Sequence, residues 1–119
     1  MRFLNALAAA IVATIIASCS PAPSPQQQTE ERERDLMAPL KTKYPTVVTG
    51  YDFKGTTVDI SVDPNELLQL GEDEQAAMEA AALDRWKSTW HATHSGHAVV
   101  TVRLIDFRGT PWSKKSARV

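Results

Sequence analysis

The five residues Asp52-Phe53-Lys54-Gly55-Thr56 recur later in the chain as Asp106-Phe107-Arg108-Gly109-Thr110. Each copy lies in a stretch where apolar and polar residues alternate, which is typical of β-strands with one buried face. Glycine adopts a positive φ at low cost, so each copy predicts a hairpin turn with glycine at its second position. A longer, bulged loop is the alternative, because lysine and arginine are not preferred in tight turns. Coincidental recurrence of five turn-forming residues is a second alternative.

The alternation on either side of the two turns predicts which side chains share a face of each strand. Around the first turn, one face holds Val47, Thr49, Tyr51 and Phe53 before it and Val58, Ile60 and Val62 after it. Around the second turn, one face holds Ala98, Val100, Val102 and Leu104, and the other holds Val99, Thr101, Arg103, Ile105 and Phe107. Two apolar faces predict that this strand is central in its sheet. Trp112 then lies on the return strand, where Pro111 and the lysines suit an edge.

A helical stretch is expected before each hairpin. Thr29 is the predicted cap of the first helix, and Pro39 is expected to kink or restart it. Its apolar side is predicted to hold Leu36, Met37, Leu40 and Tyr44.

The second helical stretch is expected in two parts. Asp63, Pro64 and Glu66 predict a capped short turn that ends at Gly71. A longer helix starts at Glu72 and ends at Ser95-Gly96, with a predicted apolar stripe of Ala76, Ala80, Leu83, Trp86 and Trp90.

The order helix, hairpin, helix, hairpin predicts an α+β fold. We expect two αββ units that form an antiparallel sheet covered on one face by two helices. Residues 29–119 are enough for one hydrophobic core and too few for two, so they are predicted to form a single small periplasmic domain.

The start of the chain has the features of a secretory signal. Arg2 is followed by an apolar run from Phe3 to Ile16, which is too short for a stable membrane span. The segment Ile16-Ala17-Ser18-Cys19 resembles the lipobox of bacterial lipoproteins. The resemblance implies a signal peptide over residues 1–18 and a diacylglyceryl group and an N-acyl chain on Cys19. An ordinary secretory signal with a free cysteine is the alternative.

In Gram-negative members of that family, an aspartate after the cysteine tends to retain the protein at the inner membrane. This chain has Ser20 there, so the resemblance implies the periplasmic face of the outer membrane, with the inner membrane as the alternative. Two or three acyl chains anchor a protein essentially permanently. Residues 19–28 comprise the lipidated cysteine and a tether rich in proline, serine and glutamine, which is expected to be extended.

The predicted domain is also similar at the level of fold to the periplasmic domain family known as BON. That family has the order helix, two strands, helix, strand, with a glycine between its first strands, and some members are outer-membrane lipoproteins. Gly55 and the alanine-rich second helix match this pattern. TonB-like carboxy-terminal domains share the hairpin, helix, strand order equally well.

Three histidines, His91, His94 and His97, have a spacing of three residues, so they are candidate ligands for Zn²⁺ or Cu²⁺. Alternatively, His91 and His94 interact favourably with the carboxyl end of the helix dipole, and Ser95-Gly96 takes His97 off the helix. No other metal or cofactor is predicted.

Two further groups are candidate binding residues. Trp86 and Trp90 lie one helical turn apart and form either an aromatic clamp for a ligand or part of the core. Lys114, Lys115 and Arg118, together with Arg108, give the carboxyl end a positive charge that suits anionic lipid head groups. Alternatively, they are charges that protect a strand edge from pairing.

Neither charge nor motifs indicate catalysis or nucleic-acid binding. The chain has 13 Lys and Arg against 14 Asp and Glu, and no nucleophile with its base, acid pair or phosphate loop is recognisable. The sequence predicts a membrane-anchored lipoprotein whose domain is a noncatalytic binding or scaffolding module for an envelope protein. The alternatives are a ligand-binding lipoprotein, with metal at the histidines or lipid at the basic end, and an unrecognised hydrolase.

Overall fold

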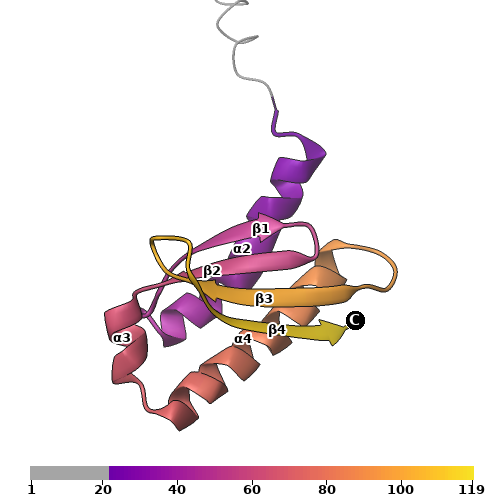
Figure 1. The fold of residues 1–119 in the computed structure, drawn as a ribbon. Coiled ribbons are helices and arrows are strands. Elements are labelled where there is room, and N and C mark those ends of the chain that lie inside the picture. The colour runs from indigo at the N-terminus through magenta and orange to yellow at the C-terminus, as the bar shows by residue number, and fades with distance from the viewer. Residues whose placement is uncertain (1–21) are drawn as a thin grey trace, which may run out of the picture.

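The computed structural model describes residues 22–119, which fold into helices and strands in an alternating order (Figure 1). In chain order the elements are α2 (Pro25–Lys43), β1 (Val48–Lys54), β2 (Thr57–Val62), α3 (Pro64–Gln69), α4 (Glu72–Thr93), β3 (Val99–Ile105) and β4 (Pro111–Arg118). The predicted α+β class and the order helix, hairpin, helix, hairpin are confirmed. The predicted signal peptide and Cys19 lie outside the described residues.

The four strands form one sheet in the order β1-β2-β3-β4, so β3 is central and β4 is at an edge, as predicted. The prediction of an antiparallel sheet is wrong at its centre. Each hairpin is antiparallel, but β2 and β3 are parallel, with Val58 opposite Val102 and Ile60 opposite Leu104. The reason is the length of α4, which at 1.5 Å per residue spans roughly 33 Å and returns the chain to the end of the sheet where β2 begins.

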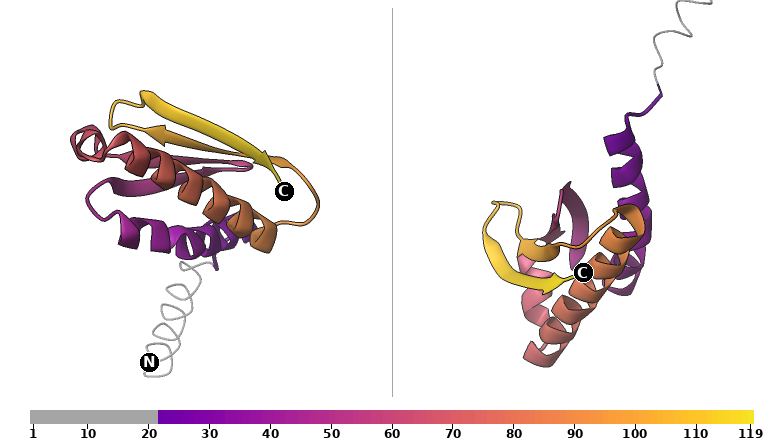
Figure 2. Two further views of the ribbon diagram at one scale, coloured as in Figure 1. Left: turned by 90° about the horizontal axis from the view of Figure 1, so that it is seen from below. Right: turned by 90° about the vertical axis from the view of Figure 1, so that its right-hand side faces the viewer.

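Both long helices lie on the same face of the sheet, as Figure 2 shows. The core between the two layers is formed by Met37, Leu40, Val47, Val48, Phe53, Val58, Ile60, Val62, Leu67, Met78, Ala82, Trp86, Trp90, Val100, Val102 and Leu104. The predicted inward faces of β2 and β3 are therefore confirmed. Within residues 22–119, no helix is both long and apolar enough to cross a membrane.

The first helix begins earlier than the sequence analysis predicted. The Ser24 hydroxyl accepts a hydrogen bond from the backbone N–H of Gln27, and the Gln27 side chain accepts one from the backbone N–H of Ser24. This capping box, with Pro25 at the first helical position, starts α2 before Thr29, the predicted cap. The last four residues of the predicted extended tether, 25–28, are consequently helical.

The predicted start of the second helical stretch is confirmed. The Asp63 carboxylate accepts hydrogen bonds from the backbone N–H groups of Asn65 and Glu66 and so caps α3. The predicted apolar stripe of α4 is wrong in its first half, because Ala76 and Ala80 are exposed. The buried side chains of α4 are Met78, Ala82, Trp86, Thr89 and Trp90. This face places Met78 rather than an alanine in the core, which removes more apolar surface from water.

The two copies of the five-residue pattern form different turns, so the prediction of matching hairpin turns is wrong. In the first copy, Lys54 pairs with Thr57, and Gly55, at φ +65°, is the first of two turn residues rather than the second. The second copy is the longer loop that the sequence left open, with Gly109 at φ +79°.

The first strand also departs from the predicted alternation. Its register shifts between Val48 and Gly50, so Val48 is buried and Thr49, predicted to share the face of Val47, is exposed. An irregularity of this kind rotates the side chains that precede it relative to those that follow.

Pro39 lies inside α2 and does not end it. Proline lacks the N–H that would bond the carbonyl one turn earlier, and its ring disturbs that turn. Two side chains from other elements donate hydrogen bonds to carbonyls of this turn. The Tyr51 hydroxyl in β1 lies 2.8 Å from the Met37 carbonyl oxygen, and Arg85 Nη1 in α4 lies 3.2 Å from the Leu36 oxygen. The disturbed turn is therefore tied to both the sheet and the neighbouring helix.

We expect Tyr51→Phe to lower the free energy of unfolding by about 1 kcal/mol, because it removes a hydrogen bond to a helical carbonyl and little apolar area. Urea denaturation followed by circular dichroism measures the change. Tyr44→Phe, at a half-buried tyrosine after the end of the same helix, is the control. Equal stability of Tyr51→Phe and the unaltered protein would show that the bond contributes nothing to holding α2.

Candidate functional site

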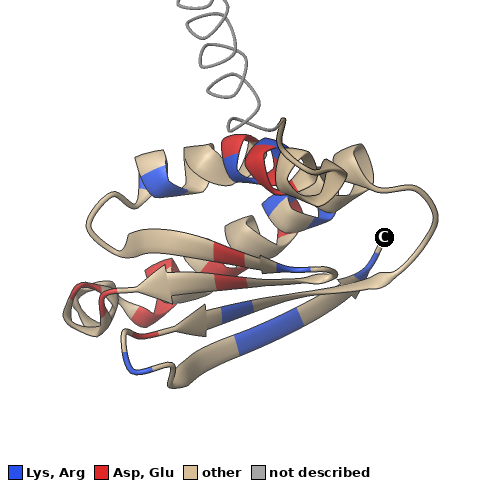
Figure 3. Ribbon diagram, turned by 90° about the horizontal axis from the view of Figure 1, so that it is seen from above, with Lys and Arg blue, Asp and Glu red and all other residues tan. Residues whose placement is uncertain are grey.

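The face of the sheet opposite the helices is polar and has charged side chains on every strand. By strand register, Asp52, Asp59, Arg103 and Lys114 form one row across β1, β2, β3 and β4. Figure 3 shows acidic residues on β1 and β2 and basic residues mainly on β3 and β4. We call this surface the open face, because no helix within the described residues covers it.

Asp59 is at the centre of the open face and is buried by the side chains that lie over it. Its two carboxylate oxygens each accept a hydrogen bond from Arg103, at 2.7 Å from Nε and 2.7 Å from Nη2. Lys54 Nζ lies 2.9 Å from Oδ2. The hydrogen bonds from Arg103, followed by the one from Lys54, hold the pKa of Asp59 below its ordinary value although burial acts in the opposite direction. This ionic group joins β1, β2 and β3.

Apolar side chains lie toward the ends of the open face. Val99 is 53% exposed at the start of β3, and Phe107 is 79% exposed in the loop that follows it. Phe107 and Ser61 line the same small cavity, so Phe107 lies at the end of the open face near β2. Trp112 is 42% exposed, and its indole N–H donates to Asp106 Oδ2 at 3.2 Å. Val99 and Phe107 are therefore exposed apolar side chains outside the core, whereas Trp112 is half-exposed and also bonds the loop between β3 and β4.

The predicted basic group is divided between the two faces of the sheet. Lys114 and Arg118 pair with Arg103 and Val99, so they belong to the open face. Lys115 pairs with Val102 on the covered face, and its Nζ lies 4.0 Å from Glu79 Oε2 of α4. Arg108 lies in the loop between β3 and β4, with its guanidinium 5.3 Å from the centroid of the Phe107 ring. The open face therefore carries two of the four predicted basic residues.

The structure does not bring the three histidines together. His91 is exposed in the last turn of α4, and His94 caps that helix. The His94 ring stacks on Trp90 with 4.7 Å between centroids, while His97 lies beyond the helix with Nδ1 3.1 Å from the Val119 carbonyl oxygen. Over residues 22–119, no group of three or more His, Cys, Asp or Glu side chains is placed to hold a metal ion.

The two tryptophans of α4 are core residues. Trp86 is fully buried and Trp90 nearly so, and Trp86 Nε1 donates to the Thr56 carbonyl oxygen at 2.9 Å. A clamp for a ligand requires exposed ring faces, so the burial supports the alternative that both rings cover the sheet.

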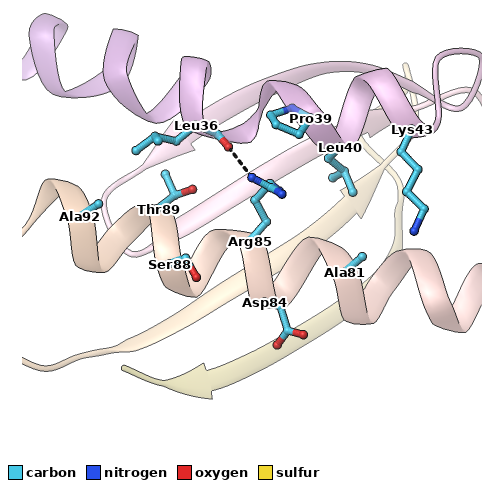
Figure 4. Close-up of a pocket in the computed structure, with 10 residues that line it drawn as sticks. All are labelled: Leu36, Pro39, Leu40, Lys43, Ala81, Asp84, Arg85, Ser88, Thr89 and Ala92. Carbon is cyan, nitrogen blue, oxygen red and sulfur yellow. Dashed lines mark hydrogen bonds between the residues drawn. The ribbon is translucent and has the colours of Figure 1, made fainter.

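A groove of about 600 Å³ runs between α2 and α4 on the helical layer (Figure 4). Figure 4 shows Arg85 reaching across it from α4 to the Leu36 carbonyl oxygen, with Pro39 and Leu40 beside it. The guanidinium of Arg85 donates to the Leu36 carbonyl, in the turn of α2 that Pro39 disturbs. We therefore assign this groove a structural role.

Two acidic residues that the sequence analysis did not single out are buried, Asp59 in β2 and Glu33 in α2. Burial of Asp59 depends on a partner 44 residues away, which no local pattern indicates. Glu33 had a detectable signal, since it precedes the core residues Met37 and Leu40 by four and seven positions on one helix face.

Comparison of the chain with protein-family models, with curated proteins and with solved structures finds no match. The function proposed below accordingly depends on the sequence features and on the geometry of residues 22–119.

We expect Arg103→Gln to lower the free energy of unfolding clearly more than Lys114→Gln does, because it removes charge-assisted hydrogen bonds from buried Asp59. The ionised form of Asp59 stabilises the fold above the unfolded-state pKa, and this contribution is lost as pH falls through the lower folded-state pKa. When the pH is lowered, the Arg103→Gln variant should therefore unfold at a higher pH than the unaltered protein. Urea titration measures the first effect and acid titration the second. Lys114→Gln, at an exposed residue in the same row of the sheet, is the control. Identical unfolding of the two variants would contradict a stabilising contact between Arg103 and Asp59.

With Trp112 replaced by phenylalanine, the emission of the protein comes from Trp86 and Trp90, since the chain has three tryptophans. We expect blue-shifted emission that resists quenching by acrylamide without any added ligand. Quenching as strong as that of the urea-unfolded protein would restore the clamp hypothesis.

Proposed function

We propose that the protein is a lipoprotein anchored through acyl chains on Cys19 at the periplasmic face of the outer membrane, and that its domain is a noncatalytic binding module for an envelope protein. The lipobox resemblance of Ile16-Ala17-Ser18-Cys19 and the serine at position 20 support the anchor and its location. The open face of the sheet supports the binding role.

One observation carries the binding role: the domain completes its core on one side of the sheet and leaves apolar side chains exposed at the other. Val99 and Phe107 are both more than half exposed. Exposed apolar residues mark interaction sites where they form a patch rimmed by polar residues. Val99 at the start of β3 and Phe107 in the loop after β3 are both uncovered, which favours a partner that docks on a preformed surface.

The early start of α2 keeps such a partner close to the membrane. Four residues lie between Cys19 and the cap residue Ser24, so the chain takes five steps, and a fully extended chain covers roughly 3.5 Å per step. The cap of α2 would then lie within about 18 Å of the acylated cysteine. Figure 1 shows the first turns of α2 projecting past β1, so the helix itself acts as part of the spacer.

A second candidate function is binding of anionic lipid head groups by the open face. Lys114 and Arg118 lie on this face, and the acid at its centre, Asp59, is already neutralised by Arg103 and Lys54. An interaction of this type weakens strongly as salt increases.

We expect a photo-crosslinking amino acid at Ser116, on the open face, to capture one recurrent envelope protein when the full-length anchored protein is expressed in its native cells. Ser88, exposed on α4, is the matched control site. Capture from Ser116 that is lost with Phe107→Ser, and kept with Leu68→Ser at an exposed leucine of α3, supports the binding module.

Equal capture from Ser116 and Ser88, or none from either, would contradict a protein-binding open face. Capture of lipid from Ser116 that disappears at high salt would favour the second candidate. Mass spectrometry of the amino-terminal peptide tests the anchor separately, because an unmodified Cys19 would refute it.

A further inference from the structure

Glu33 of α2 is a buried acid whose charge no other described residue balances. It is 3% exposed and lies on the face of α2 that also carries Met37 and Leu40 into the core. Its Oε2 atom has no hydrogen-bond partner within residues 22–119. A buried carboxylate without a donor is costly when ionised, so the position is not explained by stability alone.

Glu33 lines a cavity of about 260 Å³ between the start of α2, the tip of the first hairpin and the end of α4. Glu30 supplies a second carboxylate, while Phe53 and His94 supply aromatic rings. Among the described residues that line the cavity, none is a lysine or an arginine. The cavity is therefore acidic and partly aromatic.

Of the side chains near the cavity, Trp90 also has a buried polar atom without a hydrogen-bond partner among the described residues, its indole Nε1. The His94 ring is held parallel to Trp90, with 4° between the planes, and Arg34 lies 5.5 Å from the centroid of the Phe53 ring. Arg85 of α4 is bonded to the Leu36 carbonyl, three residues beyond Glu33 along α2. The Oε2 atom of Glu33 therefore remains a buried acceptor without a hydrogen-bond donor among the described residues.

Burial, and to a lesser extent repulsion from Glu30, raises the pKa of Glu33 from 4.5 to about 7. A positive charge in the cavity would stabilise the ionised form and lower this pKa again. Binding of a cation and loss of a proton by Glu33 are therefore coupled.

We infer that this cavity binds a small organic cation, a protonated primary amine, with Glu33 as its counter-ion. Three features favour an organic amine over a bare metal ion: the aromatic wall, the volume, and the absence, within the described residues, of three ligands placed around one point. At roughly 30 Å³ per water-sized group, the volume accommodates an amine of about five to eight heavy atoms. Ammonium groups also interact favourably with aromatic rings.

The experiment is calorimetric titration of the full-length protein with n-butylammonium chloride, which stays protonated throughout the pH range used. We expect saturable binding with a Kd in the low millimolar range at pH 7 and release of about half a proton for each amine bound, measured in two buffers of different ionisation enthalpy. Because Glu33 must be ionised, binding should be about 30-fold weaker at pH 5.5 than at pH 8.

The matched variants are Glu33→Gln and Glu31→Gln. Glutamine has the size of glutamate without its charge, and Glu31 is exposed on the same helix outside the cavity. We expect Glu33→Gln to weaken binding more than 10-fold and to abolish proton release, whereas Glu31→Gln behaves as the unaltered protein. His94→Gln should retain the pH response, which distinguishes Glu33 from His94 as the titrating group. Circular dichroism of each variant confirms that it is folded.

Absence of saturation up to 50 mM, unchanged binding by Glu33→Gln, or equally tight binding of neutral n-butanol would overturn the inference. None of these outcomes bears on the open face, because the cavity lies on the opposite side of β1 and the cross-linking at Ser116 tests a different surface.

Discussion

The carbonyl oxygen of Thr56 joins three separate parts of the domain. It accepts a hydrogen bond from the indole N–H of Trp86 at 2.9 Å and another from the backbone N–H of Thr101 at 3.0 Å. Thr56 belongs to the turn of the first hairpin, Trp86 to α4 and Thr101 to β3. A carbonyl has two lone pairs, so both bonds form together. The peptide group of Thr56 thereby fixes α4 and the second hairpin relative to the first hairpin.

This junction accounts for the difference between the two faces of the sheet. Once α4 is fixed beneath the strands and packs beside α2, the apolar side chains of β2 and β3 are buried on that side. The opposite side retains the polar residues, which Arg103, Asp59 and Lys54 order by direct ionic contacts. A partner that docks there meets side chains already held in place, which reduces the entropy lost on binding.

The features that the sequence predicted correctly are those that depend on residues close together in the chain. The Asp63 cap, the alternation around Ile60 and the central position of β3 depend on neighbouring residues, and all three are confirmed. The parallel pairing of β2 with β3 depends on where α4 directs the chain, which the hairpin pattern does not contain. The start of α2 was missed because the serine and glutamine residues that suggest an extended tether also form the capping box of this helix. Asp59 was missed because its burial depends on Arg103, 44 residues away. The spacing of Glu33 to two core residues on the same helix face was, by contrast, a local signal that the prediction overlooked.

The parallel pair also determines how the chain must fold. Each hairpin closes a short loop and can form locally, whereas the ionic contact between Asp59 and Arg103 joins residues 44 positions apart. Contacts of such separation form late, because the entropy of closing the loop must be lost first. Until α4 docks, the facing edges of β2 and β3 are both unpaired, and unpaired edges accept strands from other molecules. Two chains that fold close together can therefore exchange their second αββ halves and form an intertwined dimer.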